Sequence, residues 1–126
     1  MAPSERVRSL GLDVEVIDAV DEHLWSRILN AAERNWLESC RPDERRVWAT
    51  VIFSAKEAFY KCQYPITAQW LEFEEAHVNL ERPRTLSEAF SISVVSRSLT
   101  LTGQGRLSPE HVRTAISWPC ADVQTG

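Results

Sequence analysis

Apolar and polar residues alternate at the start of the chain, in the segment RVRSLGLDVEVID. Alternation with a period of two is typical of a β-strand, because successive side chains point to opposite faces. The two faces of the strand hold different residues: Leu10, Leu12, Val14 and Val16 on one, and Gly11, Asp13, Glu15 and Ile17 on the other. The pattern predicts a strand whose two faces have different roles.

The period then changes to that of a helix. Asp21 precedes EHLWSRILNAAERNWLESC, where the first turn is acidic, as favoured at a helix N-terminus. Apolar residues recur at helical spacing: Trp25, Ile28, Leu29, Ala32 and Trp36. We expect a single first helix from about Glu22 to Ser39.

A second helix is predicted after Pro42, Asp43 and Glu44, which are residue types that begin helices. One stripe of this segment is apolar: Trp48, Val51, Ile52, Ala55, Phe59 and Cys62. We expect the helix to end near Cys62, because Tyr64 precedes Pro65 and a residue before proline disfavours helical geometry.

Short alternations follow Trp70, in LEFEEAHVNL, AFSISVVSRSLTLTG and HVRTAISWP. They predict three or four antiparallel strands with turns near 81–84, 96–98 and 103–108. The fold class is α+β: a strand, two helices and an antiparallel sheet, formed by residues 1–126 as a single domain with a frayed end, ADVQTG.

Composition narrows the possible functions. The net charge of −4 argues against nucleic-acid binding, which needs a basic surface. No apolar run is long enough to span a bilayer, and the start lacks the apolar middle of a secretion signal, so we expect a cytoplasmic protein without membrane contact. Three widely spaced cysteines, Cys40, Cys62 and Cys120, fit neither a disulfide framework nor a zinc site and are expected to be free thiols.

Carboxylates and lysines form a pattern that the core does not explain. Asp13 and Glu15 lie two residues apart on a strand and therefore present two carboxylates on one face. At 100° per residue, Glu57 lies about 180° and Lys61 about 220° from Trp48, away from the apolar stripe. Lys56 lies near 80°, and the aromatic Phe53 and Tyr60 share the second face.

If strand and helix pack together, three carboxylates share a space with two ammonium groups. Hard oxygen ligands with open positions suit Mg²⁺, which completes its shell with water and substrate phosphates. Each piece also has an ordinary structural explanation: an Asp-x-Glu pair on a strand is commonly an exposed face, and Glu57 with Lys61 is commonly a surface ion pair.

The surrounding residues resemble a known family. GLDVE, followed by FSAKEAFYK with Glu57 44 positions after Asp13, resembles the two signatures of the 4′-phosphopantetheinyl transferase superfamily. AKEAFYKCQYPIT, QWLEFEEAHVNL and GRLSPEHVRTAIS are most similar to the enterobactin synthetase component D type. The likeness covers nearly the whole chain.

The resemblance implies transfer of the 4′-phosphopantetheine arm of coenzyme A to a serine of an acyl or peptidyl carrier protein, in siderophore or polyketide biosynthesis. It implies that Asp13, Glu15 and Glu57 bind Mg²⁺ and that Glu57 is also the general base. Lys56 and Lys61 would neutralise the diphosphate, with Lys61 acting in catalysis, and Trp70 would lie beside the pantetheine arm.

Enzymes of this type consist of two similar halves, and this chain resembles the second half only. Three interpretations remain open: a self-associating enzyme that builds its site from two copies, a half that needs a separate N-terminal-half partner, or a fragment with little activity of its own. A non-catalytic module that only binds carrier protein is a fourth possibility, which retention of the carboxylates and lysines disfavours.

Overall fold

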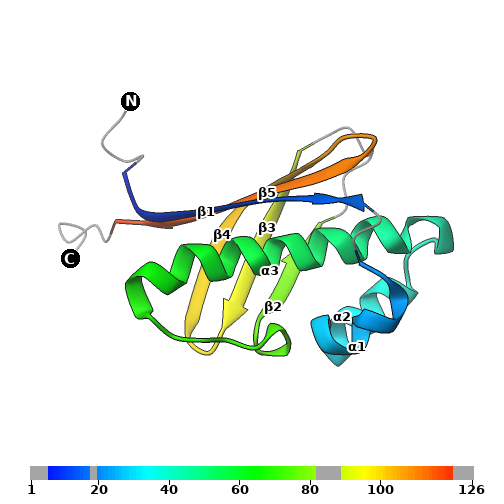
Figure 1. Ribbon diagram of the computed structural model, residues 1–126, viewed down its shortest axis with the longest axis horizontal. Coiled ribbons are helices and arrows are strands. Elements are labelled where there is room, and N and C mark those ends of the chain that lie inside the picture. Colours follow the sequence, from blue (N-terminus) through cyan, green and yellow to red (C-terminus); the bar gives the residue numbers. More distant parts are fainter. Residues whose placement is uncertain (1–5, 18–19, 82–88, 121–126) are drawn as a thin grey trace.

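A computed structural model describes residues 6–17, 20–81 and 89–120. They form two layers, with one long helix, α3 (Arg45–Thr67), lying along one face of a five-stranded antiparallel sheet (Figure 1). The α+β class predicted from the sequence is confirmed.

The elements follow one another in the predicted general order: a strand, helices, then strands. The first strand is β1 (Val7–Val16), and the helical region holds η3 (Glu22–Leu24), α1 (Trp25–Ile28), α2 (Ala31–Glu38), η4 (Pro42–Glu44) and α3. The remainder holds η5 (Phe73–Glu75), β2 (His77–Leu80), β3 (Phe90–Ser96), β4 (Leu99–Leu107) and β5 (His111–Pro119).

The strands are ordered β1-β5-β4-β3-β2, so the first strand of the chain pairs with the last. In this pairing Asp13 lies opposite Thr114, and Glu15 lies opposite Val112. β1 and β2 form the two edges of the sheet. The acidic residues of β1 are therefore on an edge strand, next to the middle of β5.

The core lies between α3 and the sheet. Every residue of the predicted apolar stripe of α3 is buried, as are the inward-facing residues of β3 to β5, which include Ile92, Val94, Leu101, Val112 and Ile116. Trp48 packs edge-on against Phe90 with ring centroids 5.5 Å apart. The helical phase assigned from the sequence is confirmed.

The single first helix predicted for residues 22–39 is wrong: the segment is broken at Leu29, which has extended backbone angles. Asn30 begins a new helix with a capping box, in which its side chain accepts from the Glu33 N–H and Glu33 accepts from the Asn30 N–H. A capping residue inside an apolar repeat therefore divided a pattern that looked continuous, because satisfying helix-end N–H groups stabilises a new helix start.

The end of α3 was also predicted too early. The helix continues through Pro65 to Thr67, and Ala68 closes it in the left-handed conformation with φ 55°. The stacked rings of Tyr60 and Tyr64, 5.2 Å apart, lie along this last stretch. Proline removes one N–H donor, and here the loss falls so close to the helix end that the helix tolerates it.

Among the predicted turns, one is right and one is wrong. Residues 96–98 do form a turn, with Arg97 at φ 56°. Most of the turn expected at 103–108 is instead strand, because β4 runs through both glycines to Leu107, and the connection to β5 begins only at Ser108. The turn expected at 81–84 and the end of the chain from residue 121 lie outside the described residues.

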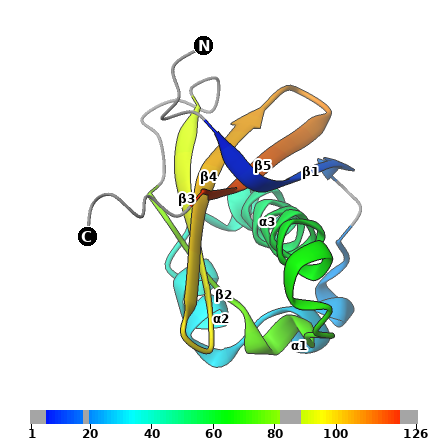
Figure 2. The same ribbon diagram turned by 90° about the vertical axis from the view of Figure 1, so that its left-hand side faces the viewer.

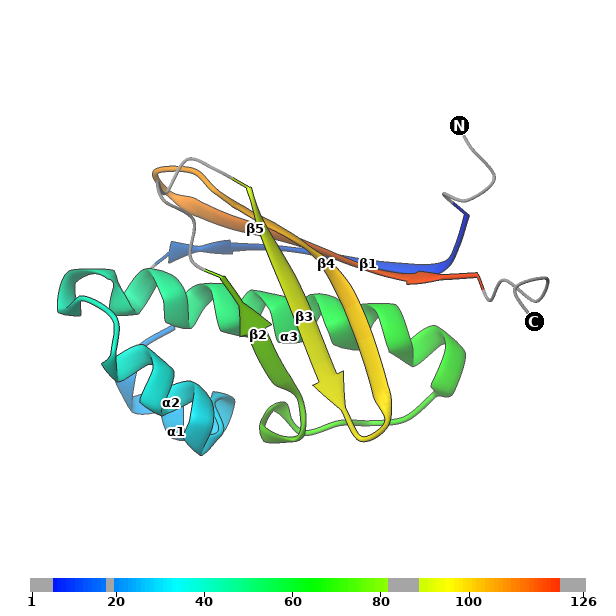
Figure 3. The same cartoon turned by 180° about the vertical axis from the view of Figure 1, so that it is seen from behind.

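The apolar face of β1 points away from the core. Leu10, Leu12, Val14 and Val16 are each 52–57% exposed, whereas Gly11 and Asp13 are buried against α3. Seen end-on, α3 covers one side of the sheet (Figure 2), and in the part of the chain that the structure describes no helix covers the other (Figure 3). We call this uncovered side the outer face.

No helix among the described residues is long and apolar enough to cross a membrane. The cytoplasmic location inferred from the sequence stays a prediction. Cys40, Cys62 and Cys120 form no disulfide among the described residues, as predicted.

Candidate functional site

The site begins with a close approach of β1 to α3 at Gly11. A Cβ atom placed on Gly11 would lie 1.9 Å from the Ala58 carbonyl oxygen and 2.8 Å from the Cys62 nitrogen, which are backbone atoms that cannot rotate away. Only glycine permits this contact. The contact brings the following residues of β1 beneath the middle of the helix.

Asp13 is buried in this contact and is held by α3. The Ser54 hydroxyl donates to Asp13 Oδ2 over 2.8 Å, and the Lys61 ammonium donates to Asp13 Oδ1 over 3.0 Å. Lys61 also donates to the Leu12 carbonyl oxygen over 3.1 Å. Both oxygens of the carboxylate are therefore held by side chains one to two helical turns apart on α3.

Glu15 and Glu57 complete an acidic cluster around Asp13. Burial, and next its contacts with Asp13, raise the pKa of Glu15 from 4.5 to about 7, and Glu57 adds to the rise. Burial and the charge of Asp13 also raise the pKa of Glu57, while Lys61 opposes the shift. The three carboxylates predicted to converge are thus brought close enough to interact electrostatically.

Lys61 is the cation of this cluster. Its hydrogen bond with Asp13, together with the charges of Asp13, Glu57 and Glu15, raises its pKa against the opposing effect of burial. Its side chain is half exposed, so the ammonium lies at the surface of the protein. One ammonium facing three carboxylates leaves the cluster with an excess of negative charge that a further cation would neutralise.

Lys56 does not belong to the cluster, and here the sequence-based expectation is corrected. Its ammonium donates to Glu33 Oε1 (2.7 Å) and to the carbonyl oxygens of Ile28 (2.6 Å) and Phe73 (2.8 Å). Both side chains of the Lys56–Glu33 pair are 1% exposed. Because an ammonium has three donors and all three are used, Lys56 has none left for a ligand in this structure.

An aromatic cluster adjoins the acidic one at the C-terminal end of α3. Tyr60 packs edge-on against Trp70 with centroids 5.4 Å apart, and burial, Tyr64 and Glu57 raise the Tyr60 pKa. Trp70 is 69% exposed, and its indole N–H donates to Glu72 over 2.9 Å. A tryptophan so exposed, held in place by its neighbours, is typical of a surface that contacts another molecule.

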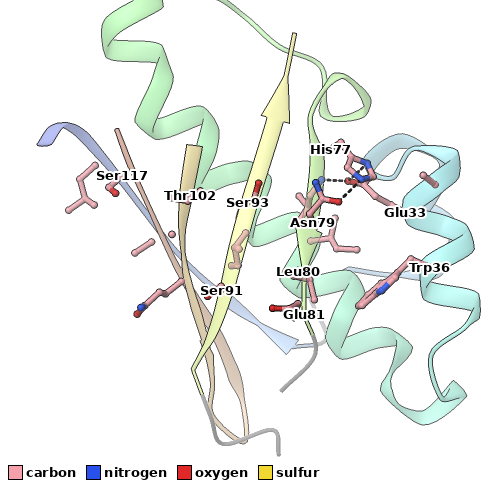
Figure 4. Close-up of a pocket in the computed structure, with 18 residues that line it drawn as sticks. Glu33, Trp36, His77, Asn79, Leu80, Glu81, Ser91, Ser93, Thr102 and Ser117 are labelled. Carbon is pink, nitrogen blue, oxygen red and sulfur yellow. Dashed lines mark hydrogen bonds and ion pairs between the residues drawn. The ribbon is translucent and has the colours of Figure 1, made fainter. Parts of the chain in front are cut away.

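A cavity of the described residues lies elsewhere. It has a volume of about 930 Å³ and lies on the outer face of the sheet, where Ser93, Thr102 and Ser117 lie on neighbouring strands (Figure 4). Leu10 contributes to the same cavity from β1. No carboxylate of the acidic cluster lines this cavity, because Asp13 is on the side of β1 that faces α3.

The carboxylate oxygens of the acidic cluster fit an open Mg²⁺ site, in which the protein supplies only some of the ligands. Within residues 6–17, 20–81 and 89–120, no three Asp, Glu, His or Cys side chains are already gathered around one point as in a closed metal centre. Mg²⁺ does not need such a cage, because it usually binds one or two carboxylates and fills its shell with water and phosphate oxygens. The metal set Asp13, Glu15 and Glu57 stays a prediction, and the chemistry of the oxygens is consistent with it.

Two residues of the site were missed by sequence reasoning. Ser54 and Thr114 share a 2.8 Å hydrogen bond beneath Asp13, and Thr114 comes from β5, sixty residues further along the chain. Ser54 stands next to the conspicuous lysine and glutamate of α3 and could have been noticed there. Thr114 carries no local signal, because only the pairing of β1 with β5 brings it to Asp13.

The family comparison covers most of the chain. A model described as the 4′-phosphopantetheinyl transferase superfamily matches residues 9–116, which include every residue of the acidic cluster.

Similar proteins carry related names. The 4′-phosphopantetheinyl transferase PptT of Mycobacterium tuberculosis (strain ATCC 25618 / H37Rv) is 37% identical over 124 residues, covering 89% of this chain and 53% of that protein. The 4′-phosphopantetheinyl transferase Npt of Nocardia iowensis is 38% identical over 81 residues, covering 64% of this chain and 36% of that protein. The chain thus spans about half the length of PptT, and its match covers about a third of Npt.

The solved structure of Thermotoga maritima holo-[acyl-carrier-protein] synthase (AcpS) has a similar fold, with a TM-score of 0.64 and 17% identity. The likeness covers 89% of this chain and 64% of that one. At this level of identity the structural match concerns the fold.

Proposed function

Since the chain belongs to the 4′-phosphopantetheinyl transferase superfamily, we propose that it transfers 4′-phosphopantetheine from coenzyme A to a serine hydroxyl of a carrier protein with the help of Mg²⁺. The observation that carries the proposal is the electrostatic influence of Asp13, Glu15 and Glu57 on one another, together with the hydrogen bond from Lys61 to Asp13. Such transfer breaks the bond between the pantetheine phosphorus and the leaving phosphate oxygen, and it forms a new bond to the serine oxygen.

In this proposal the three carboxylates hold the metal ion. Mg²⁺, when bound, would neutralise the coenzyme A diphosphate and polarise its oxygens. The carboxylates supply the negative charge that attracts the ion. Burial, and after it the neighbouring carboxylates, raise the pKa values of Glu15 and Glu57, and a bound cation would favour their charged forms.

Glu57 and Lys61 are the proposed catalytic residues. Glu57 accepts the proton of the attacking serine, and burial and the charge of Asp13 raise its pKa above the usual value for a glutamate, which favours this task. Lys61 has a half-exposed ammonium at the same place and stabilises negative charge on the phosphoryl oxygens. The correction of Lys56 leaves Lys61 as the lysine proposed for phosphate.

Trp70 is proposed to contact the pantetheine arm, together with Tyr60. The two rings form an exposed apolar wall beside Glu57, as the electrostatic influence of Glu57 on Tyr60 indicates. An extended arm of amide and methylene groups would cover apolar area there while its phosphate end reaches the carboxylates.

The second half of the site is proposed to come from a partner domain or subunit that packs on the outer face. Leu10, Leu12, Val14 and Val16 form an exposed aliphatic row, which soluble proteins normally bury in an interface. The partner is a second copy of this chain or an N-terminal half on a longer or separate chain. The alternative proposal is a dependent half that binds coenzyme A or carrier protein without catalysing transfer alone.

Mass spectrometry tests the reaction directly. The purified chain is incubated with coenzyme A, Mg²⁺ and an apo carrier protein, and the carrier is expected to gain the mass of one phosphopantetheine arm. Glu57→Gln is expected to abolish the gain while keeping the fold, whereas the exposed Glu38→Gln on α2 should behave as the unmodified chain. Transfer that survives Glu57→Gln at full rate would exclude Glu57 as the base.

Light scattering measures the molar mass of the chain in solution and tests whether two copies associate. If copies of the chain pair through the outer face, the unmodified chain is a dimer or larger at micromolar concentration, and Leu12→Asp converts it to a monomer. A monomeric chain without transfer activity favours the dependent half. A monomeric chain that transfers the arm would refute the requirement for a partner.

A further inference from the structure

Beneath the acidic cluster lies a short chain of hydroxyl groups that joins three elements of the fold. Thr114 on β5 bonds to Ser54 on α3 (2.8 Å between the two hydroxyl oxygens), and Ser54 bonds to Asp13 Oδ2 on β1 (2.8 Å). The Thr114 hydroxyl also lies 3.1 Å from the Ser54 carbonyl oxygen. Ser54 is fully buried and Thr114 is 3% exposed, so water does not compete for these bonds.

The protons of this chain have a fixed direction. The Ser54 hydroxyl has a single proton, and it donates that proton to Asp13 Oδ2. Ser54 then has no proton left for Thr114, and the Thr114 hydroxyl must donate to Ser54, at its hydroxyl or its carbonyl oxygen. Thr114 thereby sets the orientation of Ser54, and Ser54 sets that of Asp13.

The arrangement fixes the plane of the Asp13 carboxylate. Ser54 holds Oδ2 from below, and Lys61 holds Oδ1 from the exposed side. Each carboxylate oxygen keeps a further lone pair for another ligand. An apolar pair such as Ala and Val at positions 54 and 114 would fill similar space but would leave Asp13 Oδ2 without its donor, so the hydroxyls both satisfy the buried carboxylate and fix its orientation.

We propose that Ser54 and Thr114 are positioning residues that hold Asp13 in the orientation in which it binds a divalent cation. This inference rests on the proposed function, and it concerns residues behind the carboxylates that do not touch the metal or coenzyme A themselves. Groups behind metal ligands orient them, and their loss typically weakens metal binding about 10–100-fold.

The test measures binding of Mn²⁺ alone, by loss of the free-ion signal in electron paramagnetic resonance, on the full chain without substrate. Thr114→Val keeps the shape and removes the hydroxyl, and Ser54→Ala removes the donor to Asp13. Each variant is expected to bind Mn²⁺ about 10-fold more weakly. Thr114→Ser restores the hydroxyl and is expected to bind within about twofold of the unmodified chain.

Two matched controls separate positioning from general destabilisation. Thr102→Val makes the same chemical change on the outer face of β4, away from the cluster, and should leave Mn²⁺ affinity unchanged. Val94→Ala weakens the buried core at β3, so its urea unfolding midpoint is expected to fall as in the test variants while Mn²⁺ affinity stays the same.

The inference is overturned if Thr114→Val and Ser54→Ala bind Mn²⁺ as the unmodified chain does, or if Val94→Ala weakens binding to the same extent. Absence of Mn²⁺ binding by the unmodified chain at millimolar concentration also overturns it. The proposed function fails by a different observation, which is the absence of a mass gain on the carrier protein when the chain and any required partner are present.

Discussion

Replacing Lys56 separates a structural role from a phosphate-binding role. The change Lys56→Met keeps the length of the side chain and removes the ammonium. Three bonds of 2.6–2.8 Å are lost, and the Glu33 carboxylate stays in a site where its side chain is 1% exposed. Breaking a buried pair by removing one partner costs about 3–5 kcal/mol, because the remaining charge is uncompensated.

The remaining partners of Glu33 do not replace Lys56. Glu33 Oε2 accepts from the Val78 N–H at 2.7 Å, and Oε1 accepts from the Asn30 N–H at 2.9 Å. The Val78 N–H joins β2 to Glu33 of α2, and the Asn30 N–H belongs to the cap at the start of α2. Both donors are neutral, so without Lys56 the Glu33 charge is uncompensated and the contact between α2 and β2 is weakened. A loss of about 3–5 kcal/mol is a large part of the 5–15 kcal/mol that stabilises a typical domain.

The assay is urea unfolding followed by tryptophan fluorescence, because Trp25 and Trp48 are buried. A double-mutant cycle with Glu33→Gln measures the coupling, since Gln is neutral and similar in shape. We expect the double variant to lose about 2 kcal/mol less unfolding free energy than the sum of the losses in the two single variants. The structural role of Lys56 is refuted if the unfolding free energy of Lys56→Met is within about 0.5 kcal/mol of that of the unmodified chain and only the affinity for coenzyme A falls.

Three further outcomes are expected. Gly11→Ala places a methyl group 1.9 Å from the Ala58 carbonyl oxygen and should lower the unfolding free energy by about 3 kcal/mol or more, measured in urea, whereas unchanged stability would contradict the close contact. The folded chain keeps the Glu15 proton up to a pKa of about 7 and the unfolded chain only to about 4.5, so the metal-free protein should lose stability as pH rises through this interval. Because Glu15 is partly exposed, solvent screening limits this loss of stability to on the order of 1 kcal/mol. If a Glu15→Gln variant loses as much stability over the same pH interval, Glu15 is not the group responsible. Trp70→Ala should change the melting temperature little, because the ring is 69% exposed, but should raise the KM for coenzyme A through loss of the ring packed on Tyr60; an unchanged KM would exclude Trp70 from the binding wall.

The periodic patterns in the sequence were sufficient for the strand and helix types. Hydrophobic spacing identified β1, the buried stripe of α3 and an antiparallel sheet, because burial of apolar area is the main driving force of folding and leaves a regular trace. Local chemistry that interrupts the pattern was harder to see. The capping box at Asn30 and the tolerated Pro65 each moved a helix boundary.

The residues of the candidate site were recognised only in part. Asp13 and Glu15 were identified by their shared strand face, Glu57 and Lys61 by their place off the apolar stripe, and all four by the family signatures. In the structure they are close enough to influence one another electrostatically, and their roles stay predictions. Lys56 was misplaced, because angular position on a helix does not reveal that neighbouring segments supply three acceptors.

The sequence by itself determined which residues are apolar, which alternate, and which family signatures the chain carries, since these depend on neighbours along the chain. Only the tertiary structure decided that the polar face of β1 lies against α3 and that its aliphatic face stays exposed. It also decided that Thr114 lies behind Asp13. Such pairings join residues tens of positions apart, and they arise from packing between elements, which no local pattern records.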